Sequence, residues 1–354
     1  MLVFNNGNLD NTYMQNTLSF QSKNIRSFQP HEAQAQHDRT AIRYHYTSAS
    51  ALMTILKTQN NDYGFVRFTD ARYMNDRSEH MFFIKRLLEF MEKHRNDYPH
   101  CQEVINELLL KKHTIEEYTS LSISGIEETE SELISYRNSR HFLFCMCKES
   151  DSLHMWNYYI RNGNYQGYNI GIKIYDFLKS FDHESDEKYD QIRFYCGDVL
   201  YKQNKQEEEI DVLCKSIEDI CYDQYNSVAK HLRIQIAMAY LWAYIECCGL
   251  FYKDESFSDE KEYRIVIQYD VPVAGISFSS FLSANNSRIE YTYFERNGII
   301  VPCLMVPLAT DAVKQITMSP MLESQIASDS IHDYLETNGY TDVAVRQSSI
   351  PIRY

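Results

Sequence analysis

The spacing of apolar side chains predicts a chain that combines helices with short strands. Residues 42–47 alternate like a short strand, and residues 48–57 then place Leu52, Ile55 and Leu56 at helical spacing. The same criteria predict further strands at 65–68, 141–147, 171–175 and 263–268, and helices at 151–161 and 331–337. Strand and helix do not alternate regularly, so the pattern indicates an α+β fold and not a doubly wound one.

Two features complete the predicted layout. The apolar stretches 288–294 and 299–306 flank Asn297-Gly298, a pair that is typical of a tight β-hairpin turn. Longer runs at helical spacing occupy residues 78–112 and 206–251.

The predicted domain begins after an irregular segment. Residues 1–40 are rich in Asn, Gln and Ser without a regular apolar period, which is typical of a loosely ordered N-terminal arm. We therefore predict one elaborated α+β domain over residues 41–354, with helical insertions near 78–112 and 206–251.

Composition restricts the location and the partners. The chain has 354 residues, and its hydrophobic content of 44% is ample for a packed core. A net charge of -14 provides no overall attraction to nucleic acid or to an anionic membrane, so a nucleic-acid target would require a local basic surface. Nine cysteines without paired C-x-x-C motifs fit reduced thiols in a cytoplasm. No secretion signal or membrane-spanning apolar run is recognisable, so we expect a cytoplasmic protein without a membrane partner.

The first candidate group for chemistry is the segment Tyr44-His45-Tyr46-Thr47. Strand periodicity places His45 and Thr47 on one face and the two tyrosines on the other. A histidine and a hydroxyl at a strand end supply the hydrogen-bond donor and acceptor that ribose hydroxyls require. The structural alternative is a partly buried histidine with Thr47 as the N-cap of the following helix.

Two further groups lie at predicted helices. Asn75 and Asp76 precede a helix, where Asp76 and Glu79 also have the spacing of a capping box, and that role would account for both acids without a ligand. Trp156 and Tyr159 are three residues apart and share a helix face. They are candidates for stacking on a nicotinamide or adenine ring, with ordinary core packing as the alternative.

The fourth group contains two acids and a base. Alternation along a predicted strand turns Glu260, Glu262 and Arg264 to one face and Tyr263 to the other. Carboxylates beside an arginine can have their ionisation tuned for acid-base chemistry. A solvated strand with a weak ion pair explains the same pattern.

The order of these motifs resembles a known family. H-Y-T-S, M-N-D-R-S-E, M-W-N-Y-Y before two glycines, E-K-E-Y-R and S-S-I-P-I-R-Y follow one another between residues 44 and 354. In this order they resemble the bacterial domain-of-unknown-function family numbered 2971. More distantly, the pattern resembles the ADP-ribosyltransferase superfamily, which includes DNA-modifying toxins.

This resemblance implies a split β-sheet core with two helical insertions and NAD as cosubstrate. His45, an aromatic near Trp156 or Tyr159, and Glu262 would hold NAD, together with Tyr46, Thr47, Asn75 and Asp76. Glu262 would stabilise the positive charge that develops on the ribose, Glu260 would accept the proton of the incoming nucleophile, and Arg264 would orient the glutamates or meet a phosphate.

The resemblance also implies possible partners and a biological role. The acceptor of ADP-ribose would be a nucleic acid or a protein, and the role would be that of a toxin or antiviral defence effector with a regulatory or antitoxin protein as partner. His45 and Glu262 are expected to share one cleft, and Glu262→Gln is expected to leave the fold intact.

Two other functions fit parts of the pattern. Asp259-Glu260-Lys261 has the acid-x-Lys arrangement of some metal-dependent nucleases, although a second acid for Mg²⁺ is not evident. A non-catalytic nucleotide-binding or interaction module would use the same residues without turnover.

Overall fold

A computed structural model describes residues 25–28, 40–58, 63–74, 78–110, 139–160, 166–179, 192–222, 229–270, 288–322 and 325–351. The chain divides into two compact units, each assembled from segments that are distant in sequence. The helical unit is made of residues 1–27, 72–140 and 197–258, and the sheet unit of residues 28–71, 141–196 and 259–354.

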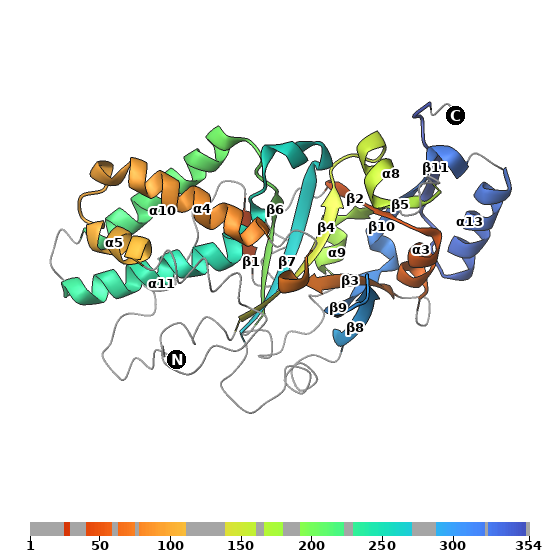
Figure 1. Ribbon diagram of the computed structural model, residues 1–354. Coiled ribbons are helices and arrows are strands. Elements are labelled where there is room, and N and C mark those ends of the chain that lie inside the picture. Colours follow the sequence, from red (N-terminus) through yellow and green to blue (C-terminus); the bar gives the residue numbers. More distant parts are fainter. Residues whose placement is uncertain are drawn as a thin grey trace. The chain divides into compact units, whose positions relative to one another are not determined.

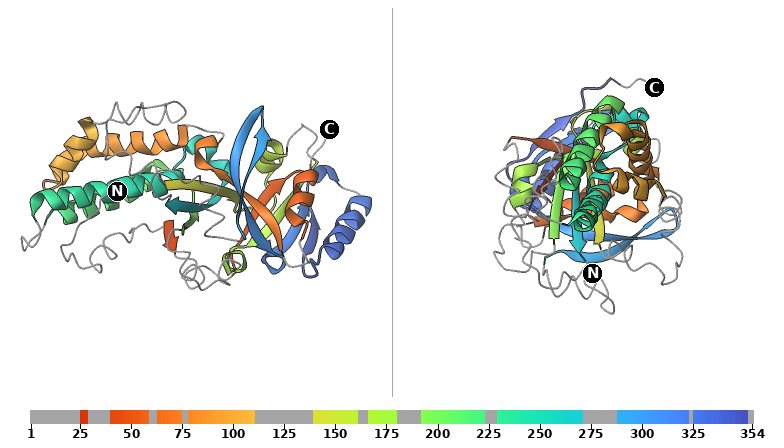
Figure 2. Two further views of the ribbon diagram at one scale, coloured as in Figure 1. Left: turned by 90° about the horizontal axis from the view of Figure 1, so that it is seen from below. Right: turned by 90° about the vertical axis from the view of Figure 1, so that its left-hand side faces the viewer.

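The helical unit contains the two stretches that the sequence predicted as helical insertions. Its long helices are α4 (Ser78–Lys93), α5 (Gln102–Leu110), α10 (Gln203–Cys221) and α11 (Lys230–Cys248), with short 3-10 turns η2 (Arg95–Asp97) and η5 (Gly249–Phe251). Figure 2 shows α10 and α11 in green beside α4 in orange. Apolar side chains such as Phe83, Leu87 and Ile210 are fully buried here, as the helical periodicity requires.

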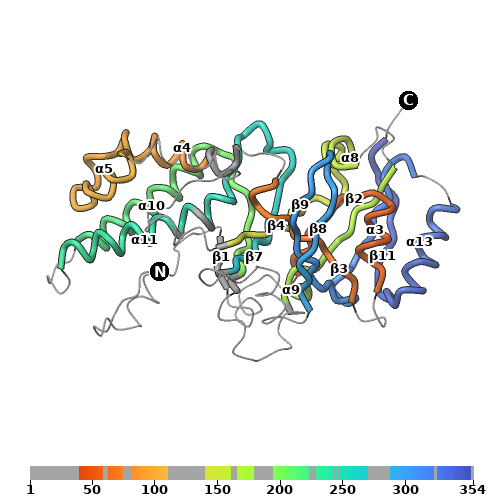
Figure 3. The backbone as a smooth tube through the Cα atoms, turned by 60° about the horizontal axis from the view of Figure 1, so that its bottom comes forward, coloured from red at the N-terminus to blue at the C-terminus, as the bar shows by residue number. Residues whose placement is uncertain are grey.

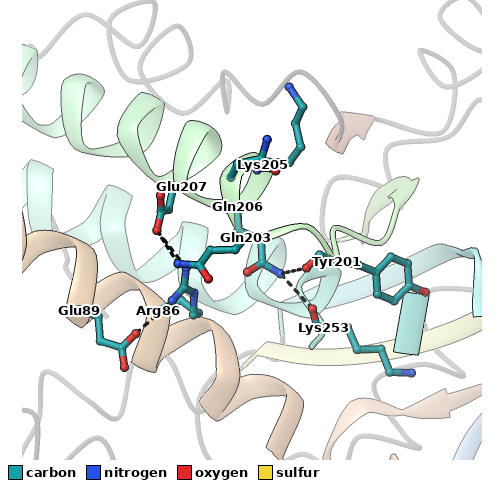
Figure 4. A network of polar contacts seen from close by, with 9 residues as sticks. Arg86, Glu89, Tyr201, Gln203, Lys205, Gln206, Glu207 and Lys253 are labelled. Atoms are coloured by element: carbon teal, nitrogen blue, oxygen red, sulfur yellow. Dashed lines mark hydrogen bonds and ion pairs between the residues drawn. The ribbon is translucent and has the colours of Figure 1, made fainter. Parts of the chain in front are cut away.

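A buried glutamine joins three backbone carbonyls in this unit. Gln206, at the start of α10, is 1% exposed, and its side-chain amide donates to the carbonyl oxygens of Leu200 at 2.7 Å, Lys253 at 2.9 Å and Tyr201 at 3.3 Å (Figure 4). The next residue of α10, Glu207, forms an ion pair with Arg86 of α4. The glutamine therefore ties both chain segments that flank α10 and α11 to the helix.

The sheet unit is built around a mixed β-sheet. The strands are β2 (Ile42–Thr47), β3 (Tyr63–Asp70), β4 (Ser139–Cys147), β5 (Tyr168–Lys173), β6 (Ile192–Asp198), β7 (Glu262–Asp270), β8 (Glu290–Arg296), β9 (Ile299–Ala309), β10 (Val313–Met318) and β11 (Ala344–Gln347). Their principal order is β6-β7-β4-β2-β5-β10-β11 (Figure 1). A further short strand, β1 (Ile25–Phe28), comes before this unit in sequence.

The sheet divides at β4. This strand pairs with β3 at Phe142 and Leu143, with β2 at Cys147, and with β7. Because a strand has only two edges, two of its three partners must follow one another along one edge. From β3 the sheet continues through β9 to β8, whose hairpin is visible in Figure 3. The predicted α+β class is thus confirmed, with one large mixed sheet that branches at β4.

In the described part of the unit the α-helices are α3 (Ala49–Leu56), α8 (Leu153–Tyr159), α9 (Ile174–Lys179) and α13 (Gln325–Thr337). The strands, α3, α9 and α13 enclose a large apolar cluster, the main core, which includes Phe144, Tyr263 and Ile265. A second cluster, the small core, contains Tyr46, Cys147, Met155, Trp156 and Ile160. Helix α8 contributes to the small core only.

Most of the predicted elements of the sheet unit are confirmed. The hairpin has Asn297 at φ 54° and Gly298 at φ 78°, the left-handed pair that the Asn-Gly motif predicts. The N-cap of α3 is Ser48 and not Thr47, since the Ser48 side chain accepts from the Ala51 backbone. The strand predicted at 171–175 ends at Lys173, where α9 begins directly.

Strands β1, β6, β10 and β11 were missed, and β1 lies within the segment predicted as a loosely ordered arm. In β10 the buried polar residues Gln315 and Thr317 bond to each other at 2.8 Å, which disguises an interior strand as a polar segment. The predicted N-terminal arm lies outside the described residues, apart from 25–28 and Thr40. Within the described part of the chain, no helix is long and apolar enough to cross a membrane.

Replacing Gln206 with Ala should lower the free energy of unfolding by about 2 kcal/mol, because buried carbonyl oxygens lose their donor. Urea denaturation followed by circular dichroism measures this change. Gln203→Ala, one turn earlier on the exposed side of α10 and bonded only to Glu207 among the contacts described, is the matched control and should cost less than about 0.5 kcal/mol. Equal effects of the two substitutions would contradict the bridging role of Gln206.

Candidate functional site

Helix α8 is fixed to the sheet by an aromatic contact in the small core. Trp156 is completely buried, and its ring meets the ring of Tyr46 edge to face at 4.6 Å. The Tyr46 hydroxyl donates to the Glu149 carbonyl at 2.9 Å and accepts from the Ser152 backbone at 3.0 Å. Burial raises the pKa of Tyr46, so the hydroxyl stays protonated and can make both bonds.

The last residue of α8 reaches a buried carboxylate. The Tyr159 hydroxyl donates to Glu260 Oε1 at 2.8 Å, and Glu260 is 7% exposed while the tyrosine is 41% exposed. Burial of the hydroxyl, together with the charges of Glu260 and Glu262, raises the pKa of Tyr159 far above its usual range. Tyr159 is therefore a neutral donor whose ring remains accessible from solvent.

A second buried carboxylate is held by arginine. Arg264 is completely buried, and its Nε and one terminal nitrogen donate to the two oxygens of Glu262 at 2.8 and 2.9 Å. This bidentate geometry is the strongest form of the Arg-carboxylate contact. We call Tyr159, Glu260, Glu262 and Arg264 the carboxylate cluster.

The two glutamates are separated by a residue in an unusual conformation. Glu260 ends the 3-10 segment η6 (Glu255–Glu260), and Lys261 has φ 44° before β7 begins at Glu262. The prediction that one continuous strand carries Glu260 and Glu262 is therefore wrong. Left-handed backbone at a non-glycine residue costs about 1–3 kcal/mol and is commonest at functional sites. An ion pair between Lys261 and Glu149 accompanies it.

The structure separates His45 from the glutamates. The His45 imidazole lies 4.8 Å from the ring of Phe144 in the main core. Two residues earlier on the same strand, the Arg43 guanidinium lies over the Tyr263 ring, 4.8 Å from its centre. Alternation along β7 turns Glu262 away from Tyr263, to the face that carries α8. The expectation that His45 and Glu262 share a cleft is wrong, because they lie on opposite faces of the sheet.

His45 instead has a structural environment. Its Nδ1 lies 3.1 Å from the Cys145 carbonyl oxygen, which can only accept, so Nδ1 carries the proton. Burial, opposed by this bond and assisted by the positive charge of Arg67, lowers the pKa of His45 to about 4. The imidazole is thus neutral at pH 7.

The other predicted ligand residues are buried in this structure. Tyr46, Thr47, Trp156 and Arg264 are at most 6% exposed, and they pack or pair inside the unit. For Trp156 the packing alternative is confirmed. Of the predicted aromatic contacts, only Tyr159 keeps an accessible ring. Asn75 and Asp76 lie outside the described residues.

An anchor next to α8 was missed by sequence reasoning. Asp151 accepts hydrogen bonds from Trp156 and from Ser348 and Ser349, so it links two of the recognised motifs. The sequence did signal both motifs, but nothing in their spacing paired them, since 197 residues separate Asp151 from Ser348.

The arrangement suits chemistry in which charge develops on a substrate. Two buried carboxylates lie on one face of the sheet unit, one bonded to a neutral tyrosine and the other paired with a guanidinium. In a water-poor site a fixed carboxylate stabilises a cation strongly. Among the described residues, no group of three or more His, Cys, Asp or Glu side chains is arranged to hold a metal ion.

One family model matches part of the chain. Residues 155–265 match the model of a family described as "Protein of unknown function (DUF2971)", in agreement with the family resemblance of the motifs. The matched segment contains all four residues of the carboxylate cluster and excludes His45. No curated protein and no solved structure matches the chain significantly.

Protonation of His45 should make the fold sensitive to acid. His45 binds a proton near pH 6.5 in the unfolded chain but only near pH 4 in the folded chain. Its contribution to the free energy of unfolding is therefore complete above pH 6.5 and falls by about 3 kcal/mol as the pH drops to 4. His45→Gln should flatten the curve of unfolding free energy against pH in this window. His332→Gln, on the exposed surface of α13, should leave the slope unchanged. A slope that survives in His45→Gln would show that another group causes it.

Glu262→Gln should destabilise the sheet unit by about 3–5 kcal/mol, because it removes the carboxylate that both bidentate hydrogen bonds of the buried Arg264 meet. The expectation that this substitution leaves the fold intact is therefore replaced. Urea denaturation at pH 7 measures the loss. The control is Glu149→Gln, which removes the exposed pair with Lys261 and should cost at most about 1 kcal/mol. Comparable losses would mean that the buried pair contributes no more than a surface one.

Proposed function

We propose that this protein is an enzyme that cleaves the bond between nicotinamide and ribose in NAD and transfers ADP-ribose to a macromolecule. The supporting observation is the bond between Tyr159 and Glu260, next to the paired Glu262 and Arg264, on the face that carries α8. Both carboxylates lie inside the segment that matches the family. The distant resemblance to ADP-ribosyltransferases supplies the cosubstrate.

Glu260 is the reacting carboxylate in this proposal. When the bond between C1′ of the ribose and the nicotinamide nitrogen breaks, its electron pair goes to the nitrogen, nicotinamide leaves neutral, and positive charge develops on the sugar. The Glu260 carboxylate stabilises this charge and then accepts the proton of the acceptor nucleophile as the new bond to C1′ forms. The Tyr159 hydroxyl holds the carboxylate in one orientation.

Glu262 acts indirectly. Arg264 donates to both of its oxygens, which compensates its charge and makes it less able to stabilise a cation. The pair therefore fixes the start of β7 and the local field around Glu260. His45 has no catalytic role in this proposal.

Tyr159 also offers the surface on which a flat ring can stack. Its accessible ring belongs to the same side chain that orients Glu260, so a nicotinamide stacked on it would bring C1′ toward the carboxylate. The acceptor class is a nucleic acid or a protein. A toxin or antiviral defence role, with a regulatory or antitoxin protein as partner, follows from the resemblance alone.

Incubation with labelled NAD and cell extract tests the proposal. Protein, DNA, RNA and free nicotinamide are analysed separately, and we expect nicotinamide release together with label in one macromolecular fraction. Binding of NAD without turnover would instead indicate a nucleotide-binding module, and chelator-sensitive cleavage of DNA or RNA a metal-dependent nuclease.

Glu260→Gln should reduce nicotinamide release about a hundredfold or more, because Gln still accepts from Tyr159 but carries no charge. The dissociation constant for NAD should change far less. Glu255→Gln, an exposed acid in the same 3-10 segment, is the matched control and should retain full turnover. Undiminished turnover in Glu260→Gln, with an unchanged melting temperature, would remove Glu260 from the mechanism.

A further inference from the structure

Asp151 is a convergence point for hydrogen bonds from two distant parts of the sheet unit. Its Oδ1 accepts from Trp156 Nε1 and from Ser348 Oγ, both at 2.7 Å. Its Oδ2 accepts from the backbone of Ser349 at 2.7 Å and from its hydroxyl at 3.0 Å. Although burial alone raises the pKa of Asp151, these bonds outweigh it and hold the pKa below its usual value. The carboxylate is charged, and every contact named here is a donor.

The segment Ser348–Ile350 is itself anchored at both ends. The Ser348 backbone donates to the Met318 carbonyl at 2.9 Å, and the Ile350 backbone donates to Ser348 Oγ at 3.2 Å. The Ile350 side chain packs against the small core. The segment therefore connects the end of strand β10 with the small core, and Asp151 binds the segment between these two contacts.

Trp156 transmits this anchor to the carboxylate cluster. It is the fully buried residue of α8, and Tyr159 follows three positions later on the same helix face. Helix α8 has only 7 residues, too few to be stable by itself, so its position depends on tertiary contacts. A contact that holds the Trp156 indole in place therefore also holds the Tyr159 hydroxyl within hydrogen-bonding distance of Glu260.

We propose that Asp151 and the segment Ser348–Ile350 form a strap that holds α8 in the position at which Tyr159 meets Glu260. Asp151 is a positioning residue, since it acts through Trp156 and Tyr159 and does not touch the reacting atoms. The catalytic consequence rests on the proposed function, whereas the position of α8 does not.

A double-mutant cycle tests the catalytic consequence. Asp151→Asn replaces one acceptor oxygen with an amide donor, and we expect nicotinamide release to fall about tenfold or more, since small misplacements are costly in catalysis. In a Tyr159→Phe background the same substitution should reduce release no more than about twofold, because the contact it maintains is already absent. Asp329→Asn, an exposed acid on α13, is the control and should change neither background. If the effects of Asp151→Asn and Tyr159→Phe on nicotinamide release multiply in the double variant, the positioning role is overturned.

Tryptophan fluorescence tests the strap without any enzymatic activity. The chain has two tryptophans, so Trp242→Phe leaves Trp156 as the only one, and excitation at the red edge of the absorption band selects it over the tyrosines. In that background, Ser349→Ala and then Ser348→Ala/Ser349→Ala should shift the emission stepwise to longer wavelength and increase quenching by acrylamide. The graded series separates displacement of α8 from global unfolding, which would appear as one full transition.

The two tests distinguish the proposals. If the wild-type protein releases no nicotinamide, the proposed function fails, and the fluorescence series alone decides the strap. Emission and quenching of Trp156 that stay unchanged in the double serine variant would overturn the strap, whatever the enzymatic result.

Discussion

Strand β4 has hydrogen-bonding groups along only two edges, and this limit organises the sheet unit. Three strands pair with it, so β3 and β2 take successive positions, and the sheet divides where β3 stops and β2 begins. Around β4 the two faces of the sheet pack against different clusters. Phe144 and Tyr263 face the main core, whereas Tyr46 and Cys147 face the small core and α8. The face of the sheet on which a side chain lies therefore decides whether it belongs to the candidate site.

The face that carries α8 concentrates buried charge. A guanidinium as fully enclosed as that of Arg264 is stable only with a carboxylate beside it, and Glu262 supplies that carboxylate from two residues away on the same strand. Glu260 accepts a hydrogen bond from the neutral Tyr159 hydroxyl.

The sequence was a good guide to local structure and a poor guide to which face a residue joins. Alternation correctly grouped Glu262 with Arg264, and Asn297-Gly298 correctly predicted a left-handed hairpin turn. The same alternation does not show how β2 and β7 align across β4. His45 was therefore predicted to lie with Glu262, whereas the strand register puts His45 on the opposite face of the sheet. Contacts such as that of Asp151 with Ser348 could not be predicted, because only tertiary folding brings residues 197 positions apart together.

The interleaving of the two units has a consequence for biosynthesis. The sheet unit takes strands from before, between and after the helical segments, so its contacts span long stretches of chain. Tyr159 must wait for Glu260, which emerges 101 residues later, and Asp151 must wait longer still for Ser348. At about 5–20 residues per second, synthesis leaves a nascent chain without its assembled cluster for many seconds. The carboxylate cluster therefore assembles only after the start of β7 has joined the sheet, and its contact through Asp151 only after Ser348 has followed.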